Sequence, residues 1–132
     1  MRKITPLKYS SDVKDGYLSV TISGNFSLPE AKTIYIEALE SLLKNDLSKL
    51  FIDAFKIKGI VKTIDRYYFG EFAALESMKY MAKGLKRISV SICGDEPIID
   101  PDRFGEIVAR NRGLDLKVTT DKNESLQFLG IK

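Results

Sequence analysis

Two short apolar runs with a long helical pattern between them set the strongest limit on how this chain can fold. The first is Lys-Leu-Phe-Ile-Asp at residues 49–53, and the second is Arg-Ile-Ser-Val-Ser-Ile-Cys-Gly at residues 87–94. Short, strongly apolar strands are typical of parallel sheets, whose faces are covered by helices. Parallel neighbours need a crossover connection, so the helical pattern between the runs predicts a strand–helix–strand unit.

The same alternation continues on both sides of this unit. Apolar periodicity and turn residues predict strands at residues 4–10, 17–23, 49–53, 87–94 and 114–119. Helices are expected at residues 27–45, 63–83, 100–113 and 121–129. The order is strand, strand, helix, strand, helix, strand, helix, strand, helix. We therefore expect one α/β domain over residues 1–132, with a mixed, mostly parallel sheet of about five strands that opens with an antiparallel hairpin.

Several helix boundaries carry recognisable capping residues. Ser27 with Glu30 and Asp121 with Glu124 have the spacing of capping boxes. Asp100 followed by Pro101 reads as an N-cap and a first helical residue, and Thr63 reads as the N-cap of the second helix. These signals predict where the helices begin.

Composition limits the chemistry that the chain can perform. It has no histidine, which excludes catalytic groups built on Ser-His-Asp or Cys-His and zinc sites built on histidine. Its single cysteine, Cys93, excludes an intramolecular disulfide and fits a reducing compartment. Because Cys93 lies within an expected strand, we interpret it as a buried, unreactive thiol. We expect a protein that is not an enzyme and needs no cofactor.

Charge and hydropathy indicate a cytoplasmic protein. The formal net charge of +3 is small, and lysine and arginine are spread along the chain, which does not favour nucleic-acid binding. No apolar run is long enough to span a membrane, and the first residues lack the apolar core of a signal peptide.

The expected second helix is apolar over an unusually wide arc. Helical spacing predicts that one group of its residues faces the sheet: Ile64, Tyr68, Phe72, Leu75 and Met78. Other large side chains lie at different angles: Tyr67, Phe69, Tyr80 and Met81. A helix of this kind either fills a core completely or has a second contact, such as a pocket, a protein partner or a second copy of the chain.

A basic connector precedes this helix. Lys56, Lys58, Lys62 and Arg66 lie close to its expected N-terminus. Lysine side chains and free helix N–H groups both favour negative charge, so the connector is a candidate site for an anionic group. The alternative is a solvated loop that keeps the chain soluble.

Acidic residues give a weaker hypothesis. Asp53 and Asp65 could form a metal or acid–base pair at one strand end, and a second acidic group lies on the loop at residues 95–102. Their spacing matches no metal-binding loop, and capping and loop solubility explain them. We expect no metal site and no catalytic residue.

Several segments make the chain similar to STAS domains, the fold of bacterial anti-anti-sigma factors, and in particular to the bacterial stand-alone STAS-like group related to CRAL-TRIO lipid-binding proteins. The segments are residues 20–24 (Val-Thr-Ile-Ser-Gly), 50–53 (Leu-Phe-Ile-Asp) with Gly59, 104–113 and 119–129. In anti-anti-sigma factors a phosphorylated Ser begins the second helix, and Thr63 stands at that place here. The flanking residues differ, since Val61 and Lys62 replace the acid and the first serine of that motif.

The resemblance and the second helix together predict a non-enzymatic regulatory module that binds a protein partner, a second copy of itself or a small ligand. The alternative function is a carrier or sensor of an apolar anion, such as a fatty acid or lipid. The candidate binding residues are Lys58, Lys62, Thr63, Arg66, Tyr67, Phe69, Met78 and Met81. Thr63 is also a candidate phosphorylation site.

Overall fold

The strands form a single sheet in the part of the chain that the computed structural model describes, residues 5–84 and 86–131. The strands are β1 (Lys8–Val13), β2 (Leu18–Asn25), β3 (Lys49–Lys58), β4 (Ser89–Cys93) and β5 (Asp115–Thr119). The helices are α1 (Leu28–Lys44), α2 (Thr63–Ala82), α3 (Phe104–Asn111) and α4 (Lys122–Phe128). The predicted element order is confirmed. Ile4, where the first strand was expected to begin, lies outside the described residues.

The strands lie side by side in the order β1-β2-β3-β4-β5. β1 pairs with β2 in the antiparallel sense, and every later pair is parallel. This confirms the expected mixed sheet with an initial hairpin. Because β2 to β5 run in the same direction, their carboxyl ends meet at one edge, which is where open α/β sheets usually bind ligands.

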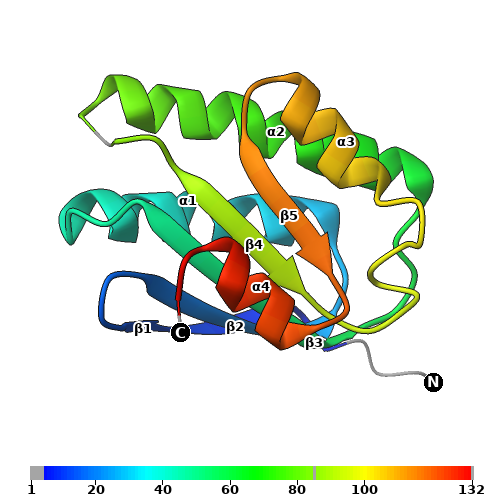
Figure 1. Cartoon of the computed structure of the whole chain (residues 1–132). Coiled ribbons are helices and arrows are strands. Elements are labelled where there is room, and N and C mark those ends of the chain that lie inside the picture. Colours follow the sequence, from blue (N-terminus) through cyan, green and yellow to red (C-terminus); the bar gives the residue numbers. More distant parts are fainter. Residues whose placement is uncertain (1–4, 85, 132) are drawn as a thin grey trace.

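The two faces of the sheet have different covers, as Figure 1 shows. α1, α2 and α3 lie over one face, against the inward side chains of the parallel strands, such as Val20, Ile52 and Val90. α4 lies over the other face. There Leu126, Phe128 and Leu129, at the end of the helix, form a small core with Phe51 and Cys93. The larger core is therefore on the face that carries three helices.

A bulge in β3 changes which side chains reach the larger core. Thr21 pairs with Asp53 and Ser23 with Lys56, so two steps along β2 match three steps along β3. One extra residue reverses the alternation of a strand beyond it. As a result, Ile57 packs against the larger core as Ile52 does, although the two are an odd number of residues apart.

Several predicted boundaries are wrong. β1 runs from Lys8 to Val13 and not over residues 4–10. β3 continues to Lys58, so Lys56 and Lys58 belong to the strand and not to a loop. α3 begins at Phe104 after a turn, and its N-cap is Arg103 rather than Asp100. Asp100 still contributes, because its carboxylate accepts a hydrogen bond from the Phe104 backbone N–H at 3.3 Å.

Of the four predicted N-caps, two are confirmed, and those of α2 and α3 are wrong. Ser27 accepts from the Glu30 N–H, and Asp121 accepts from the N–H groups of Asn123 and Glu124. The N-cap of α2 is Lys62, and Thr63 is the first helical residue. The side chain of Lys62 makes no capping hydrogen bond.

The face of α2 that points inward is not the predicted one. The buried residues of the helix are mostly small: Gly70, Ala73, Ala74, Ser77 and Tyr80. Ile64, Tyr68, Leu75 and Met78, which were expected to face the sheet, are exposed, whereas Phe72 does pack against the core. Small side chains allow close helix packing, and α2 uses them to lie between α1 and α3.

α2 and α3 approach each other very closely at Gly70. A Cβ atom on Gly70 would lie 2.6 Å from the Gly105 carbonyl oxygen. This is well inside van der Waals contact, so the two backbones touch at a point where only glycine fits on α2.

We expect Gly70→Ala to destabilise the fold by about 1–3 kcal/mol, because the new methyl group must push α3 away. Helix propensity alone would make the variant more stable, since alanine favours a helix over glycine by about 1 kcal/mol. Gly105→Ala is the matched control, because its Cβ would meet the Arg66 carbonyl oxygen at an ordinary 3.4 Å. Urea unfolding of both variants tests the contact, and equal stabilities would contradict it.

Candidate functional site

The residues predicted to bind a ligand lie at the carboxyl edge of the sheet and along α2. Lys58 ends β3, and Lys62 and Thr63 stand at the start of α2, all three with exposed side chains. The Thr63 hydroxyl is therefore open to solvent, as modification would require. Neither lysine lines the cavity described below.

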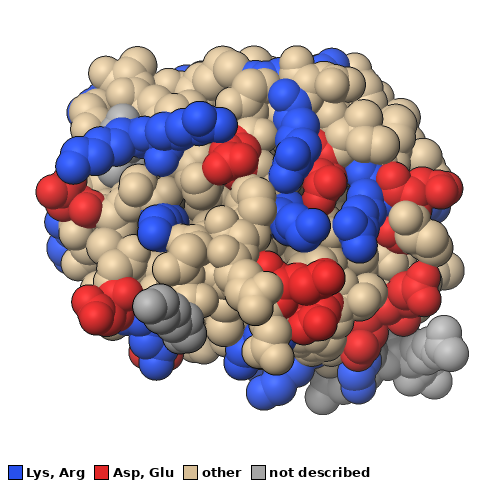
Figure 2. Space-filling model, in the orientation of Figure 1, with Lys and Arg blue, Asp and Glu red and all other residues tan. Residues whose placement is uncertain are grey.

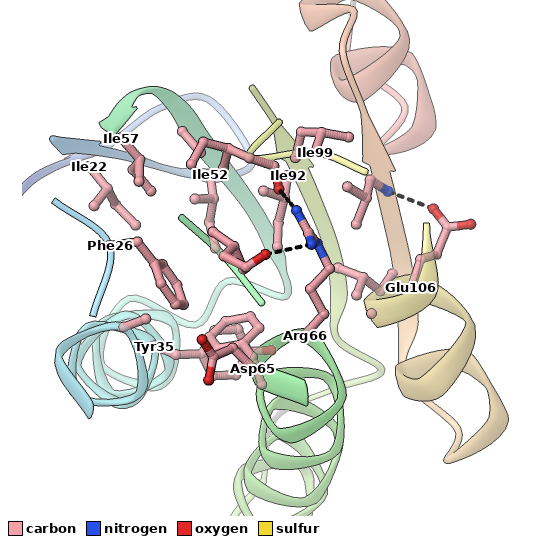
Figure 3. Close-up of a pocket in the computed structure, with 18 of the residues that line it drawn as sticks. Ile22, Phe26, Tyr35, Ile52, Ile57, Asp65, Arg66, Ile92, Ile99 and Glu106 are labelled. Carbon is pink, nitrogen blue, oxygen red and sulfur yellow. Dashed lines mark hydrogen bonds between the residues drawn. The ribbon is translucent and has the colours of Figure 1, made fainter. Parts of the chain in front are cut away.

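The Arg66 side chain is bound by other groups of the protein. Its guanidinium donates hydrogen bonds to the backbone oxygens of Val61 at 2.8 Å, Pro97 at 2.6 Å and Ile98 at 3.0 Å. It also forms an ion pair with Asp100 at 3.5 Å. Figure 3 shows the guanidinium turned toward the loop that carries Ile99. Arg66 thus joins α2 to the loop after β4, and its donors are largely used.

Tyr67 belongs to a polar contact between α2 and α3. Its hydroxyl donates to Glu71 at 3.3 Å and accepts from Arg112 at 3.2 Å. Arg112 also pairs with Glu71 at 3.1 Å, and the Tyr67 ring stacks on Phe104. These bonds hold the two helices together beside the Gly70 crossing.

The remaining predicted residues divide between the core and the surface. Phe69 packs its ring edge-on against Tyr35, with 5.7 Å between ring centroids, and Met81 packs against the larger core. Met78 is 43% exposed, and its terminal methyl lies near Gly113. The predicted set therefore does not form one site.

One side of α2 carries a stripe of exposed apolar residues. Ile64, Tyr68, Leu75 and Met78 are spaced so that they follow one another along a single face, and each is 43–51% exposed. Ile60 in the preceding loop is 81% exposed. We call these five residues the α2 stripe. No helix in the described ranges is both long enough and apolar enough to cross a membrane.

A cavity of about 130 Å³ lies on the opposite side of α2, between the helices and the sheet. Its walls come from β2 to β5, from α1, α2 and α3 and from the loops between them, and they are almost wholly apolar. Figure 3 shows Phe26 and Asp65 on one side of it and Ile92 and Ile99 on the other. Ile57 enters the wall because of the β3 bulge.

Most of the cavity wall has no recognisable pattern in the sequence. Phe26, Tyr35 and Ile99 line the cavity but are not among the predicted binding residues. Of the predicted binding residues, only Arg66 and Phe69 line it. Apolar and charged residues alternate from Phe55 to Lys58, and this pattern could have revealed that the strand is longer. A β-bulge has no comparable pattern in the sequence.

Asp53 and Asp65, weighed as a pair, have different surroundings. Asp53 accepts a hydrogen bond from the Phe55 N–H at 3.0 Å, and Asp65 lies at the cavity. Among the described residues, no group of three or more acidic or cysteine side chains could hold a metal ion.

Cys93 is buried under α4. Burial, with a smaller contribution from the nearby Asp53 carboxylate, raises the pKa of its thiol to about 11. The thiol is therefore protonated at neutral pH.

Comparison with known proteins establishes the fold. An anti-sigma factor antagonist from Mycobacterium paratuberculosis has a similar structure, with a TM-score of 0.55, 13% sequence identity and 92% coverage of each chain. The chain has a STAS-like fold. No family model and no curated protein matches it. At this identity the likeness concerns the arrangement of the helices and strands, and it transfers no binding residue.

We expect Arg66→Ala to destabilise the domain by about 2–3 kcal/mol, because three backbone carbonyls and Asp100 lose a largely buried partner. Lys62→Ala, one turn earlier at an exposed position, should change stability by less than about 0.5 kcal/mol. Urea unfolding measures both. Similar losses in the two variants would show that Arg66 does not fasten the loop.

Cys93 should react very slowly with a thiol-specific reagent in the folded protein at pH 8. Raising a thiol pKa from 9.0 to about 11 lowers its thiolate fraction roughly 100-fold, and burial adds a steric barrier. The rate should rise as the pH approaches 11 and should be fast in urea. A native rate equal to the unfolded rate at pH 8 would contradict the assignment.

Proposed function

We propose that this protein is a non-enzymatic regulatory module with a STAS-like fold that binds another protein through the α2 stripe and the basic segment before it. The observation that carries this proposal is the stripe itself. Large apolar side chains at the surface are exposed to water at a cost, and a contiguous row of them usually marks an interaction surface.

The shape of the stripe fits a helix-in-groove contact. Its members lie along one face of a twenty-residue helix, so they can enter an apolar groove together. α3 supports the helix on its inner side, through the close contact at Gly70 and through the hydrogen bond between Tyr67 and Arg112. Because the helix is already ordered, little conformational entropy is lost when a partner binds. In Figure 2, the upper border of the molecule, where Figure 1 places α2, is mostly uncharged.

Charge at one end of the stripe indicates the chemistry of the partner. Lys58 and Lys62 are exposed beside Ile60 and Ile64. A partner with an apolar groove and an acidic rim at one end would complement this arrangement, and such charges mainly favour fast, oriented association. The similar structure is described as an anti-sigma factor antagonist, which supports a role in regulation through protein contacts.

A photoreactive phenylalanine analogue at Tyr68 should capture the partner in cells of the source organism. The same analogue at Val13 on β1, a residue 55% exposed, is the control for random encounters. For the purified partner, the double variant Ile64→Glu with Leu75→Glu should weaken binding about 30-fold or more, since apolar anchors dominate such interfaces. Val13→Glu should leave the Kd unchanged. Calorimetry gives the values.

Two results would count against this proposal. In the first, the captured protein binds the double variant as tightly as it binds the unaltered chain, which would show that it does not contact the stripe. Light scattering that shows a dimer dispersed by Leu75→Glu, without capture of another protein, would make a second copy of the chain the occupant.

The cavity supports a second function, the binding of a small apolar ligand. Its volume is close to that of engineered apolar cavities of about 150 Å³, which stay dry and bind benzene. A full-length fatty acid is larger than this space. We therefore propose a smaller apolar ligand than the fatty acid or lipid that the sequence led us to expect. The ligand would lie behind α2, at the carboxyl edge of the sheet.

A further inference from the structure

We infer that the cavity binds a small apolar amine, with the ammonium group against Asp65 and the apolar body inside. This inference rests on the second proposed function, ligand binding in the cavity, and names the class of ligand. It begins from the size of the cavity, which admits a single ring or a short branched chain. The apolar walls select the body of the ligand, and the few charged groups around them select its polar end.

Most of the charges around the cavity are already paired. Arg66 bonds three backbone oxygens and Asp100. Glu106 accepts from the Val118 N–H at 2.6 Å and lies 3.9 Å from the Arg110 guanidinium. Within residues 5–84 and 86–131, the side chains of Asp65 and Arg103 are the cavity-lining charges for which the structure shows no hydrogen bond or ion pair.

The position of Asp65 favours it over Arg103 as the recognition group. Figure 3 shows the Asp65 carboxylate leaving the first turn of α2 on the side away from the Arg66 guanidinium and toward Phe26. Arg103 is the N-cap of α3, whose Gly105 and Glu106 form another part of the cavity wall. The half-buried Asp65 side chain thus shares the cavity wall with the aromatic residues Phe26, Tyr35 and Phe69.

Aromatic rings and a carboxylate together are suited to a cation. Phe26, Tyr35 and Phe69 all line the cavity, and the Tyr35 hydroxyl is engaged with Ser77 at 2.7 Å. Ring faces attract ammonium groups, and a charge-assisted hydrogen bond to a carboxylate is stronger than a neutral one. An acid placed here would instead be repelled by Asp65.

Three ligands of nearly equal size test the inference: benzylamine, benzyl alcohol and benzoate. Each is titrated into the full chain and followed by amide and methyl NMR shifts, which locate the site and give a Kd. Benzylamine should bind about tenfold more tightly than benzyl alcohol, and benzoate more weakly than either. Shifts should centre on Phe26, Tyr35, Phe69 and Ile92.

Two variants separate the charge from the cavity. Asp65→Asn should bring the affinity for benzylamine down to that for benzyl alcohol and leave benzyl alcohol itself unaffected. Ala31→Leu, which fills the cavity from α1, should abolish binding of all three. Thermal unfolding verifies that each variant is folded.

The outcomes are distinguishable. Benzyl alcohol bound in the cavity without any preference for the amine would overturn the role of Asp65 and leave the ligand function intact. Tighter binding of benzoate would assign the polar end to Arg103 and overturn the inference. No cavity shifts with any of the three ligands would overturn both the inference and the ligand function, but not the partner function of the α2 stripe.

Discussion

The row of small residues on α2 decides the arrangement of everything around it. Because Gly70, Ala73, Ala74 and Ser77 face inward, α2 settles between α1 and α3 instead of resting its large side chains on the sheet. As a consequence, large apolar residues on the other side of the helix remain in solvent. The cavity lies nearer the start of the helix, where Asp65, Arg66 and Phe69 line it.

Much of the fold could be predicted because its signals are local. Short apolar strands, the Ser27 and Asp121 caps and the turn after β1 each depend on a few neighbouring residues. The strand order then follows from crossover connections that leave few alternatives. The antiparallel hairpin and the parallel remainder of the sheet follow from the same rules.

The candidate site could be predicted only in part, because it depends on contacts between distant segments. The inward face of α2 was misjudged since helical spacing identifies stripes of large apolar residues and is blind to glycine and alanine as packing surfaces. Arg66 drew attention as a free cation, yet its partners include Pro97 and Ile98, which no spacing rule connects to it. The bulge that turns Ile57 into the cavity is likewise set by pairing with β2.

The stripe and the cavity lie on opposite sides of the same first turns of α2. Ile64 and Tyr68 belong to the stripe, whereas Asp65 and Phe69 line the cavity, so the residues alternate along the same helical segment. A ligand that shifts this segment changes the surface that a partner meets. Linkage requires the effect to be reciprocal, and its size cannot exceed the difference in ligand affinity between the free and partner-bound states. Arg66 lies within this segment and bonds the loop after β4, and Gly70 directly follows the segment and contacts α3. The effect of a cavity ligand on the stripe is therefore limited by how far these contacts let the segment move.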